Sequence, residues 1–426
     1  TPLYSSAASD VYKRQVEEAL TKGVVVVTGG PGTGKTTTIN LMIRCFEMEK
    51  MDIVLAAPTG RAAKRMTEAT GYEAKTIHRL LEVSGGIEDG DSSHFEKNED
   101  NPIEADAVIL DEMSMVDIHL MYSLLKAIVP GTRLILVGDS NQLPSVGPGN
   151  VLKDIIDSKA FSVVRLSKIY RQAESSHIVL NAHKINAGEL ITLDNKNKDF
   201  FFFEKKDVRS VMGALVYLVK TRLPEYIGAS PFEIQVLTPM RKGELGVEHL
   251  NEVLQYYLNP ASESKKEKEG RTGVFREGDK VMQVKNNYKL EWKITNAKGF
   301  SIEEGLGVFN GDMGIIKQIN TYSERITVVF DENREAEYPF SSLDELELAY
   351  AITIHKSQGS EYPAVVLPLL SGPPILCNRN LLYTAITRAQ KCVAIAGRQS
   401  MVEQMIHNET EQKRYSGLND CLKEGL

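Results

Sequence analysis

The chain has 426 residues, of which 42% are hydrophobic and 25% charged, and its formal net charge at pH 7 is −7. This composition is typical of a globular protein with two or three domains, and it excludes a protein whose whole surface is basic and binds nucleic acid. A local basic channel stays compatible with the acidic total, because phosphate contacts depend on nearby charge. The longest apolar runs, residues 23–28 and 363–370, are shorter than the ~20 residues of a membrane span, so no membrane association is expected.

The ends and the cysteines add two expectations. Residues 1–15 lack an initiator Met and any hydrophobic pattern, so we expect a disordered or non-native segment there and a missing natural start. The cysteines form no Cys-x-x-Cys pair and no Cys/His cluster, which predicts free thiols and the cytosol as compartment. They are Cys45, Cys377, Cys392 and Cys421.

The first half of the chain alternates short apolar strands with amphipathic helices. Strands are predicted at residues 24–28, 53–57, 108–110 and 134–137, and helices at 16–22, 36–50, 60–70 and 118–129. This alternation predicts a doubly wound parallel sheet, whose ligands lie beyond the carboxyl ends of the strands. Residues 83–102, rich in Gly, Asp, Glu, Ser and Asn, interrupt the pattern and are expected to be a loop or small hairpin.

A second α/β unit is expected from residue 163 onward, with an insertion of different texture. Its strands are predicted at residues 163–166, 234–238, 364–367 and 392–396. Residues 261–271 look like a turn region, and short antiparallel strands follow at 281–284, 313–319, 326–330 and 336–340. Pro339 puts the last of these at a sheet edge. We interpret residues 272–343 as a small β-barrel inserted into the second unit.

Residues 29–36 read Gly-Gly-Pro-Gly-Thr-Gly-Lys-Thr, directly after a predicted strand and before a predicted helix. This is the phosphate-binding pattern Gly-x4-Gly-Lys-Thr in the context that it requires. Lys35 is expected to reach the β- and γ-phosphates, and Thr36 to bind Mg²⁺. The expected nucleotide contacts in this stretch are Gly30, Pro31, Gly32, Thr33, Gly34, Lys35, Thr36 and Thr37.

An apolar strand followed by two carboxylates supplies the second part of a nucleotide site. Asp111 is expected to hold Mg²⁺, and Glu112 to orient and deprotonate the attacking water. With the phosphate loop, these residues predict NTP hydrolysis, with ATP and Mg²⁺ as cofactors. They do not indicate what work the hydrolysis drives.

Six further segments follow in a fixed order. They are residues 57–63 (APTGRAA), 76–81 (TIHRLL), 136–144 (LVGDSNQLP), 166–172 (LSKIYRQ), 351–361 (AITIHKSQGSE) and 382–389 (LYTAITRA). Together with the phosphate loop they resemble superfamily 1 DNA helicases of the RecD-like type, over about residues 15–397. The resemblance implies an α/β fold with two RecA-like P-loop NTPase domains, ATP bound in the cleft between them, and an SH3-like β-barrel in the second.

The resemblance also implies domain bounds. The first motor domain would be residues 16–162, with a hairpin or wedge insertion at 83–103. The second would be residues 163–271 and 344–426, and the barrel residues 272–343. Longer family members carry an N-terminal region with helical hairpins that has no counterpart here. The chain is therefore expected to be a motor fragment.

Roles for single residues follow from position in the matched motifs. The resemblance makes Gln142 the γ-phosphate sensor, Arg171 and Arg388 arginine fingers, and Gly359 and Glu361 nucleotide contacts. An adenine-contacting Gln would fall at Gln15. Another group of residues is expected to contact the DNA strand, either at its backbone phosphates or by stacking on its bases. These residues are Pro58, Thr59, Arg61, Thr76, His78, His355, Lys356 and Ser357.

The implied activity is 5′-to-3′ translocation on single-stranded DNA with unwinding of duplex. The expected partners are single-stranded DNA and junctions of single- and double-stranded DNA, with recombination or repair proteins as candidates, and the motor is expected to be monomeric. Other functions stay open: the helicase half of a conjugative relaxase, another 5′-to-3′ superfamily 1 helicase, the helicase subunit of a multi-protein nuclease, or a non-unwinding ATP-switch subunit of a recombination or repair complex. No relaxase-like His cluster or catalytic Tyr context precedes the motor, and the full set of ATPase motifs argues against a pure switch.

Overall fold

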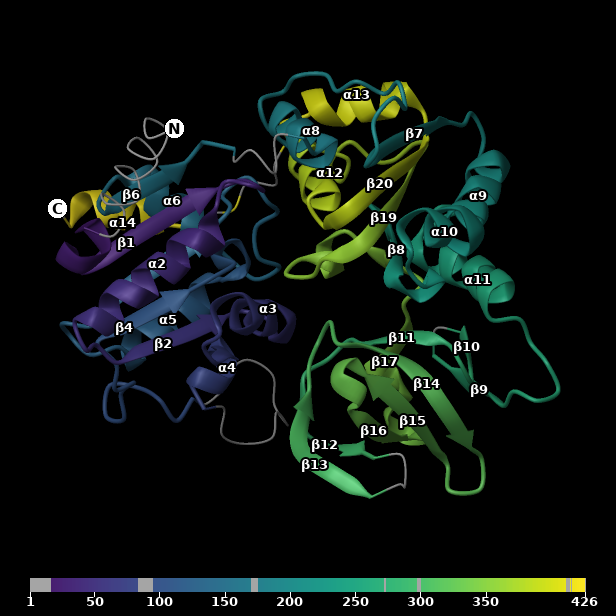
Figure 1. The fold of residues 1–426 in the computed structure, drawn as a ribbon, viewed down its shortest axis with the longest axis horizontal. Helices are drawn as coiled ribbons and strands as arrows, with labels where there is room; N and C mark the ends of the chain where they lie inside the picture. Colours follow the sequence, from purple (N-terminus) through teal and green to yellow (C-terminus); the bar gives the residue numbers. More distant parts are fainter. Residues whose placement is uncertain are drawn as a thin grey trace, which may run out of the picture. The chain divides into compact units, whose positions relative to one another are not determined.

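The computed structural model describes residues 17–82, 95–169, 175–271, 273–296, 300–410, 414 and 416–425. The chain forms two compact units, and each is described here by itself (Figure 1). The first unit comprises Thr1–His183 with Glu411–Leu426, and the second Lys184–Thr410. None of the helices in the described ranges is long and apolar enough to cross a membrane.

The first unit is built on a six-stranded sheet in the order β3-β2-β4-β5-β1-β6. All of its strand pairs are parallel. The strands are β1 (Val24–Gly29), β2 (Ile53–Ala57), β3 (Ala74–Thr76), β4 (Ala107–Leu110), β5 (Arg133–Gly138) and β6 (Ser162–Leu166). The helical segments are α2 (Lys35–Met48), α3 (Gly60–Thr70), α4 (Ile77–Leu80), η1 (Met113–Met115), α5 (Ile118–Ala127), α6 (Val151–Ser158), α8 (His177–Asn186), which ends beyond the unit, and α14 (Leu418–Glu424).

Helices cover both faces of this sheet. Along β1, Val25 and Val27 belong to one apolar cluster with Ile39 of α2. Val26, one residue out of phase, belongs to another cluster with Leu124 of α5. Because side chains alternate along a strand, a continuous valine run fills both clusters, as buried parallel strands require.

Strand β6 corrects the predicted boundary between the two motor domains. We expected residues 163–166 to open the second unit, but β6 pairs with β1 of the first sheet. The pairing runs from Val25 with Ser162 to Gly29 with Leu166. A short apolar run reveals that a strand is present, whereas the choice between two sheets depends on long-range packing.

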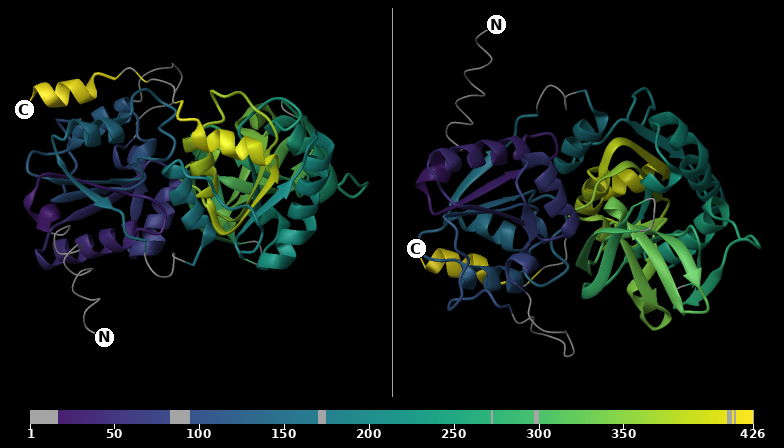
Figure 2. Two further views of the ribbon diagram at one scale, coloured as in Figure 1. Left: turned by 90° about the horizontal axis from the view of Figure 1, so that it is seen from above. Right: turned by 60° about the horizontal axis from the view of Figure 1, so that its bottom comes forward.

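The C-terminal part of the chain corrects the same prediction at its other end. We assigned residues 344–426 to the second unit, whereas α14 packs on α6 of the first unit. Leu418 and Leu422 of α14 lie against the cluster formed by α4, α5 and α6. Figure 2 shows α14, in yellow, lying with the elements of the first unit.

The second unit contains a five-stranded parallel sheet in the order β18-β8-β19-β20-β7. Its strands are β7 (Phe200–Glu204), β8 (Ile234–Thr238), β18 (Ala351–Thr353), β19 (Tyr362–Leu369) and β20 (Ala389–Gly397). The helical segments around it are α9 (Val208–Tyr217), η2 (Leu218–Arg222), α10 (Leu223–Ile227), η3 (Pro231–Glu233), α11 (Val247–Leu258), η6 (His355–Ser357), α12 (Arg379–Ile386) and α13 (Gln399–His407). Strand β7, which the sequence analysis did not identify, forms one edge of the sheet.

The insertion forms a seven-stranded antiparallel sheet in the order β13-β12-β16-β15-β14-β11-β17. Its strands are β11 (Lys280–Gln283), β12 (Asn287–Thr295), β13 (Ser301–Val308), β14 (Met313–Asn320), β15 (Arg325–Phe330), β16 (Glu335–Pro339) and β17 (Leu346–Leu348), with the 3-10 turns η4 (Asp331–Asn333) and η5 (Phe340–Glu345). The predicted fold class, two RecA-like α/β sheets with a small β insertion, is confirmed.

Two details of this region were predicted wrongly. Strand β16 is internal, between β12 and β15, although Pro339 suggested an edge. The proline is tolerated because β12 pairs with Ala336 and Glu335 at the other end of β16, so the ladder needs no N–H from Pro339 on that side. The predicted turn region at residues 261–271 contains β9 (Glu267–Gly270), which pairs with β10 (Gly273–Arg276).

A buried carboxylate joins the insertion to α11 and β18. Asp279 is 0% exposed. Its Oδ1 accepts hydrogen bonds from Asn259 Nδ2 (2.7 Å) and the Tyr350 hydroxyl (2.9 Å). Its Oδ2 accepts from Gln255 Nε2 (2.6 Å) and the Arg276 backbone N–H (2.6 Å). These donors satisfy the carboxylate and hold together the segments that lead into and out of the insertion.

Candidate nucleotide and nucleic-acid site

The predicted site residues of the first unit gather at one edge of its sheet. Because all six strands are parallel, their carboxyl ends lie together, and ligands of such sheets bind there. The sequence analysis placed no site residue at the opposite edge. The site residues at this edge are Thr76 at the end of β3 with His78 after it, Pro58 and Thr59 after β2, Asp111 and Glu112 after β4, Gln142 after β5, and the phosphate loop at the end of β1.

The phosphate loop is shaped by glycines and by its own lysine. Gly32 and Gly34 have positive φ values of 70° and 85°, in the region that favours glycine. Lys35 Nζ donates to the carbonyl oxygens of Gly29 (2.6 Å) and Gly30 (3.2 Å), so the ammonium group lies over the loop. Thr36 is exposed in the first turn of α2, where backbone N–H groups lack helical partners and favour anions.

Close packing holds the loop against its neighbours. A Cβ on Gly29 would lie 2.8 Å from Leu166 Cβ and 2.9 Å from Leu166 O, so β6 leaves room only for glycine. His183 of α8 lies with Nε2 3.2 Å from the Pro31 carbonyl oxygen. The sequence analysis missed His183, because no local pattern links it to residue 31.

The two carboxylates after β4 lie in a strained and poorly solvated turn. Glu112 has φ 53° and ψ 40°, a left-handed conformation that is uncommon for glutamate. Burial, together with the charge of Glu112, raises the pKa of Asp111 to about 6, and the Glu112 backbone N–H and the cations Lys35 and Arg65 oppose the shift. Within the described ranges, Asp111 accepts one hydrogen bond, from the Glu112 backbone N–H (2.8 Å).

This environment fits a divalent cation. A half-buried carboxylate with a single donor gains from a positive ion, and Mg²⁺ commonly takes one or two protein ligands and retains waters. The described residues include no group of three or more His, Cys, Asp or Glu side chains suited to a metal.

Arg65 is a further charged residue that the sequence analysis missed. Its Nη1 lies 3.9 Å from Glu112 Oε1, and it comes one helical turn after Arg61 in α3. The available signal was a second arginine on the helix that follows β2. Its charge acts to lower the pKa of Asp111, against the larger effect of burial.

The loop after β5 contains a buried amide with an unused acceptor. Gln142 is 7% exposed, and its Nε2 lies 3.5 Å from Asp139 Oδ2, a long hydrogen bond. Its Oε1 is buried without a partner among the described residues. Asp139 also accepts from the Asn141 backbone N–H (3.0 Å). A buried polar atom without a partner is unusual, and it marks Gln142 as a side chain available for a ligand or water.

Two of the candidate DNA-binding residues of the first unit already have structural roles. Thr59 Oγ1 accepts from the Ala62 backbone N–H (3.2 Å) and caps α3. Thr76 Oγ1 accepts from the Arg79 backbone N–H (3.1 Å) and caps α4. Helix capping is therefore a sufficient reason for both hydroxyls.

His78, Pro58 and Arg61 lie beside these caps. The ring of His78 is 6.0 Å from that of Phe95, at 52°. Burial lowers the pKa of His78, and Asp117 partly opposes this, so the imidazole is neutral at pH 7. A neutral ring suits stacking better than an ion pair with phosphate. Pro58 and Arg61 are half-buried, on the turn before α3 and in its first turn.

In the second unit, the structure brings Arg388 next to the segment containing Gly359 and Glu361. Arg388 Nη1 donates to Ser360 O (3.3 Å), and Arg388 O accepts from the Tyr362 backbone N–H (2.8 Å). Both segments precede their strands, β19 and β20, so they lie at the amino edge of this parallel sheet. Gly359 has φ 71°, and Glu361 Oε2 accepts from Gln390 Nε2 (3.3 Å).

Residues 354–361 connect the two edges of the second sheet. Strands β18 and β19 are both parallel to β8, so the chain must return from the carboxyl end of one to the amino end of the other. His355 and Lys356 lie on this connection in η6, and Ser357 Oγ donates to Ile354 O (2.7 Å). A DNA strand bound by η6 and a nucleotide bound near residue 359 would thus contact the same short segment of the chain.

Lys356 is engaged by an acidic partner. Its Nζ donates to Glu347 Oε2 (3.1 Å), and Arg241 Nη2 binds the other carboxylate oxygen at 2.5 Å. Burial acts to raise the pKa of Glu347, but Arg241 and Lys356 outweigh it and the net pKa is lowered. A DNA phosphate would have to compete with Glu347 for this ammonium group.

Several predicted features lie outside the described residues: Gln15 and the rest of 1–15, Arg171, and residues 83–94 of the expected wedge. The described end of the wedge segment, residues 95–102, is a turn around Asn98, whose Oδ1 accepts from the Asp100 backbone N–H (2.9 Å).

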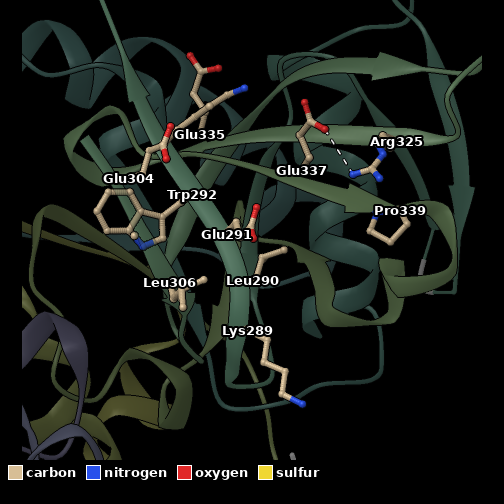
Figure 3. A pocket seen from close by; sticks show the side chains of 12 residues that line it. Lys289, Leu290, Glu291, Trp292, Glu304, Leu306, Arg325, Glu335, Glu337 and Pro339 are labelled. Carbon is tan, nitrogen blue, oxygen red and sulfur yellow. Dashed lines mark hydrogen bonds and ion pairs between the residues drawn. The ribbon is translucent and has the colours of Figure 1, made fainter. Parts of the chain in front are cut away.

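A pocket on the inserted sheet has a different character. It has a volume of about 750 Å³ and lies among β12, β13, β15 and β16 (Figure 3). Trp292, Leu306 and four glutamates line it together with three cations, and Arg325 pairs with Glu337 (3.4 Å). None of the residues predicted for nucleotide or DNA lines this pocket, and its mixed charge does not favour phosphate.

The fold and the edge of the first sheet define a P-loop NTPase of the RecA-like kind. Three parts of the chain match family models: residues 13–148 an AAA domain, residues 250–330 the SH3 domain of ATP-dependent RecD-like DNA helicases, and residues 348–396 a UvrD-like helicase C-terminal domain. The RecBCD enzyme subunit RecD of Mycolicibacterium smegmatis is 31% identical over 95% of this chain and 73% of its own length. Its Mycobacterium tuberculosis counterpart is 33% identical over 93% and 70%. The chain belongs to the RecD-like family of DNA helicases, and the predicted resemblance is confirmed.

Another relative, the ATP-dependent RecD2 DNA helicase of Deinococcus radiodurans, is 37% identical over 88% of this chain. The chain spans 47% of that protein's length. Among solved structures, Bacteroides Pif1 bound to single-stranded DNA superposes with a TM-score of 0.51 at 19% identity, covering 92% of this chain and 93% of that one. The Pif1 complex with ADP-AlF3 and single-stranded DNA gives 0.51 at 20% identity over 92% of each chain. These likenesses show the helicase fold.

Proposed function

We propose that this chain is an ATP-dependent DNA helicase motor that translocates 5′ to 3′ on single-stranded DNA and opens duplex at junctions. The observation that carries the proposal is the gathering of the phosphate loop, two carboxylates and a glutamine with an unused acceptor at one sheet edge in a member of the RecD-like family. Each of these groups suits phosphoryl transfer, in which positioning and charge stabilisation supply most of the catalysis.

The proposed chemistry assigns one task to each side chain. Lys35 leaves the loop carbonyls and binds the β- and γ-phosphates of ATP. Thr36 and Asp111 would hold Mg²⁺, which would neutralise charge on the phosphates. Glu112, which lies 3.9 Å from Arg65, orients the attacking water and takes its proton. Gln142 uses its free Oε1 to fix the same water or its Nε2 to contact the γ-phosphate.

Arg388 and Arg171 are proposed as the arginine fingers, with Gly359 and Glu361 as further nucleotide contacts. The hydrogen bond from Arg388 Nη1 to Ser360 O supports this, because it links Arg388 to the segment that we propose for the nucleotide contacts. Arg388→Ala is expected to lower kcat for DNA-stimulated ATP hydrolysis by ~10³ while leaving ATP affinity nearly unchanged. Steady-state kinetics and equilibrium binding of a labelled ATP analogue measure the two effects. A kcat within tenfold of wild type would remove Arg388 from the site.

DNA contacts are proposed for Pro58, Thr59, Arg61, Thr76, His78, His355, Lys356 and Ser357. Their placement supports contacts without base reading: capped helix starts beside His78 in the first unit, and the η6 segment in the second. Sequence-tolerant motors need backbone and stacking contacts of this type.

Polarity is tested by strand displacement on partial duplexes that carry either a 5′ or a 3′ single-stranded tail. The wild-type chain with ATP and Mg²⁺ is expected to unwind the 5′-tailed substrate preferentially. Lys35→Ala serves as the matched control and is expected to unwind neither, with ATP turnover reduced by about 10³. Preferential unwinding from a 3′ tail would reject the proposed direction, and near-normal turnover by Lys35→Ala would reject the nucleotide site.

A second candidate function is that of a motor subunit in a larger recombination or repair enzyme. The mycobacterial relatives, named as RecBCD subunits, favour it. The same substrates decide between the two: ATP hydrolysis stimulated by single-stranded DNA, without displacement of either duplex, favours a subunit that needs partners.

A further inference from the structure

The C-terminal part of the chain contacts the loop that follows the candidate γ-phosphate sensor. Arg414 Nη1 donates to Gly147 O, to Gly149 O (3.1 Å) and, at a longer 3.5 Å, to Ser145 Oγ. One guanidinium group therefore binds three acceptors within residues 145–149, which we call the sensor-flanking loop. It begins three residues after Gln142 and leads to α6.

The start of α5 also contacts the sensor-flanking loop. The Ile118 backbone N–H donates to Pro148 O (3.0 Å). A Cβ on Gly147 would lie 2.1 Å from Asp117 Oδ2, so the loop backbone packs directly against that carboxylate. Asp117 in turn caps α5 by accepting from the Leu120 backbone N–H (2.9 Å). The loop thus contacts both the N-terminus of α5 and Arg414.

The same C-terminal segment also contacts the helix at the far end of the loop. Asn419 Nδ2 donates to Asp154 O of α6 (3.2 Å). Leu418 and Leu422 of α14 pack on the apolar cluster that includes Ile155. The hydrophobic contacts hold the segment in place, and Arg414 is its hydrogen-bonded contact with the loop.

The buried side chain of Gln142 has few hydrogen bonds. Its side chain has one long hydrogen bond, to Asp139, and its Oε1 has no partner among the described residues. The position of its amide therefore depends on the backbone of the loop. The hydrogen bonds from Arg414 to Gly147 O and Gly149 O fix the backbone of that loop, because a charged donor binds carbonyl oxygens more strongly than a neutral one.

We propose that Arg414 is a positioning residue for ATP hydrolysis, which acts by fixing the sensor-flanking loop so that Gln142 meets the γ-phosphate and its attacking water. The inference rests on the proposed function. Arg414 touches neither nucleotide nor metal in this role. It adds a requirement outside the helicase motifs, namely an arginine from the C-terminal segment.

The experiment compares Arg414→Ala, Arg414→Lys and Asn419→Ala in DNA-stimulated ATP hydrolysis by the full chain. Asn419→Ala is the matched control, because it removes a hydrogen bond of the same segment without touching the loop. Arg414→Ala is expected to lower kcat about tenfold, which corresponds to ~1.4 kcal/mol, with KM for ATP changed less than about twofold. Arg414→Lys should recover part of the loss, and Asn419→Ala should match wild type.

A double-mutant cycle with Gln142→Ala tests whether Arg414 acts through the sensor. If it does, Gln142→Ala with Arg414→Ala should have the same kcat as Gln142→Ala alone. Multiplied losses would overturn the inference, and so would an unchanged kcat in Arg414→Ala or an equal loss in Asn419→Ala. Thermal unfolding separates a folding defect from a kinetic one: if Arg414→Ala melts early, the lysine variant and the cycle built on it decide.

Failure of the proposed function looks different from failure of this inference. If the wild-type chain shows no ATP hydrolysis stimulated by single-stranded DNA, the proposed function fails first. If wild type is active and Gln142→Ala is impaired while Arg414→Ala is normal, only the positioning role is wrong.

Discussion

Two buried or half-buried aspartates of this protein have opposite surroundings. Asp279, between the insertion and α11, is 0% exposed and receives four hydrogen bonds. Asp111, at the carboxyl edge of the first sheet, accepts one hydrogen bond. The next residue, Glu112, has a left-handed backbone conformation. Burial raises the pKa of both carboxyls.

The contrast separates structural from functional burial. A satisfied carboxylate stabilises one arrangement of its donors and has no remaining acceptor capacity for a ligand. The other kind of carboxylate is partly desolvated, lies next to a second acid and accepts few hydrogen bonds. A bound cation stabilises the charge of such a carboxylate most. Strain and unpaired polar groups are expected where a protein binds a reactant.

The largest expected effect concerns catalysis at Asp111. Asp111→Asn should lower kcat for ATP hydrolysis by ~10³, because the neutral amide binds Mg²⁺ poorly. Asp279→Asn is the matched control at the satisfied carboxylate and should keep kcat within about twofold. Steady-state ATPase assays with saturating single-stranded DNA measure both. Equal losses of kcat in the two variants would contradict the distinction between a functional and a structural aspartate.

The next effect is on stability at Asp279. Asp279→Ala should reduce the free energy of unfolding by about 3 kcal/mol or more, since four buried donors lose their acceptor. Asp111→Ala should reduce the free energy of unfolding far less. It leaves only one backbone N–H without its acceptor, and it removes a carboxylate that lies close to a second acid. Urea denaturation followed by far-UV circular dichroism gives the values, and the reverse order would contradict the assignment.

The pH dependence of stability sharpens the comparison further. The pKa of Asp111 is raised to about 6, so the folded state binds its proton more tightly than the unfolded state. That contribution is fully present below the ordinary carboxyl pKa near 4 and is lost as pH rises through 6. We therefore compare the free energies of unfolding of Asp111→Asn and wild type without Mg²⁺. The value for the variant minus that for wild type should increase by about 1–3 kcal/mol when the pH is raised from 4 to 7.5. A difference that does not change with pH would rule out the raised pKa.

The smallest effect distinguishes two buried glutamines. Gln255 Nε2 donates to Val274 O (2.8 Å) as well as to Asp279, whereas Gln142 Oε1 has no partner in the described ranges. Gln255→Leu should cost about 2 kcal/mol of stability, and Gln142→Leu less than about 0.5 kcal/mol. Chemical denaturation of both variants tests this. A large loss for Gln142→Leu would indicate a structural role.

Local patterns predicted much of the first unit. The valine run of β1, the glycines of the phosphate loop and the acids after β4 are short-range features, and the structure has the strand, turn and helix that they imply. The fold class and the family resemblance were confirmed as well. Polarity and the roles of single residues stay predictions.

Errors arose where pairing partners are distant in sequence. Residues 163–166 were recognised as a strand but assigned to the wrong sheet, and Pro339 was taken to mark an edge although β16 is internal. The helix α14 was assigned to the second unit because it follows that unit in the chain. In each case the choice depends on apolar surfaces contributed by residues far away.

The sequence by itself determined that this chain has a phosphate loop, carboxylates suited to Mg²⁺ and an ordered series of RecD-like motifs, because each is a local arrangement of residue types. Only the tertiary structure decided which acids are satisfied, which glutamine has a free acceptor and that Arg414 reaches the sensor-flanking loop. The physical reason is that hydrogen-bond satisfaction and burial depend on groups brought together by folding, more than 260 residues apart for Arg414 and Gly149.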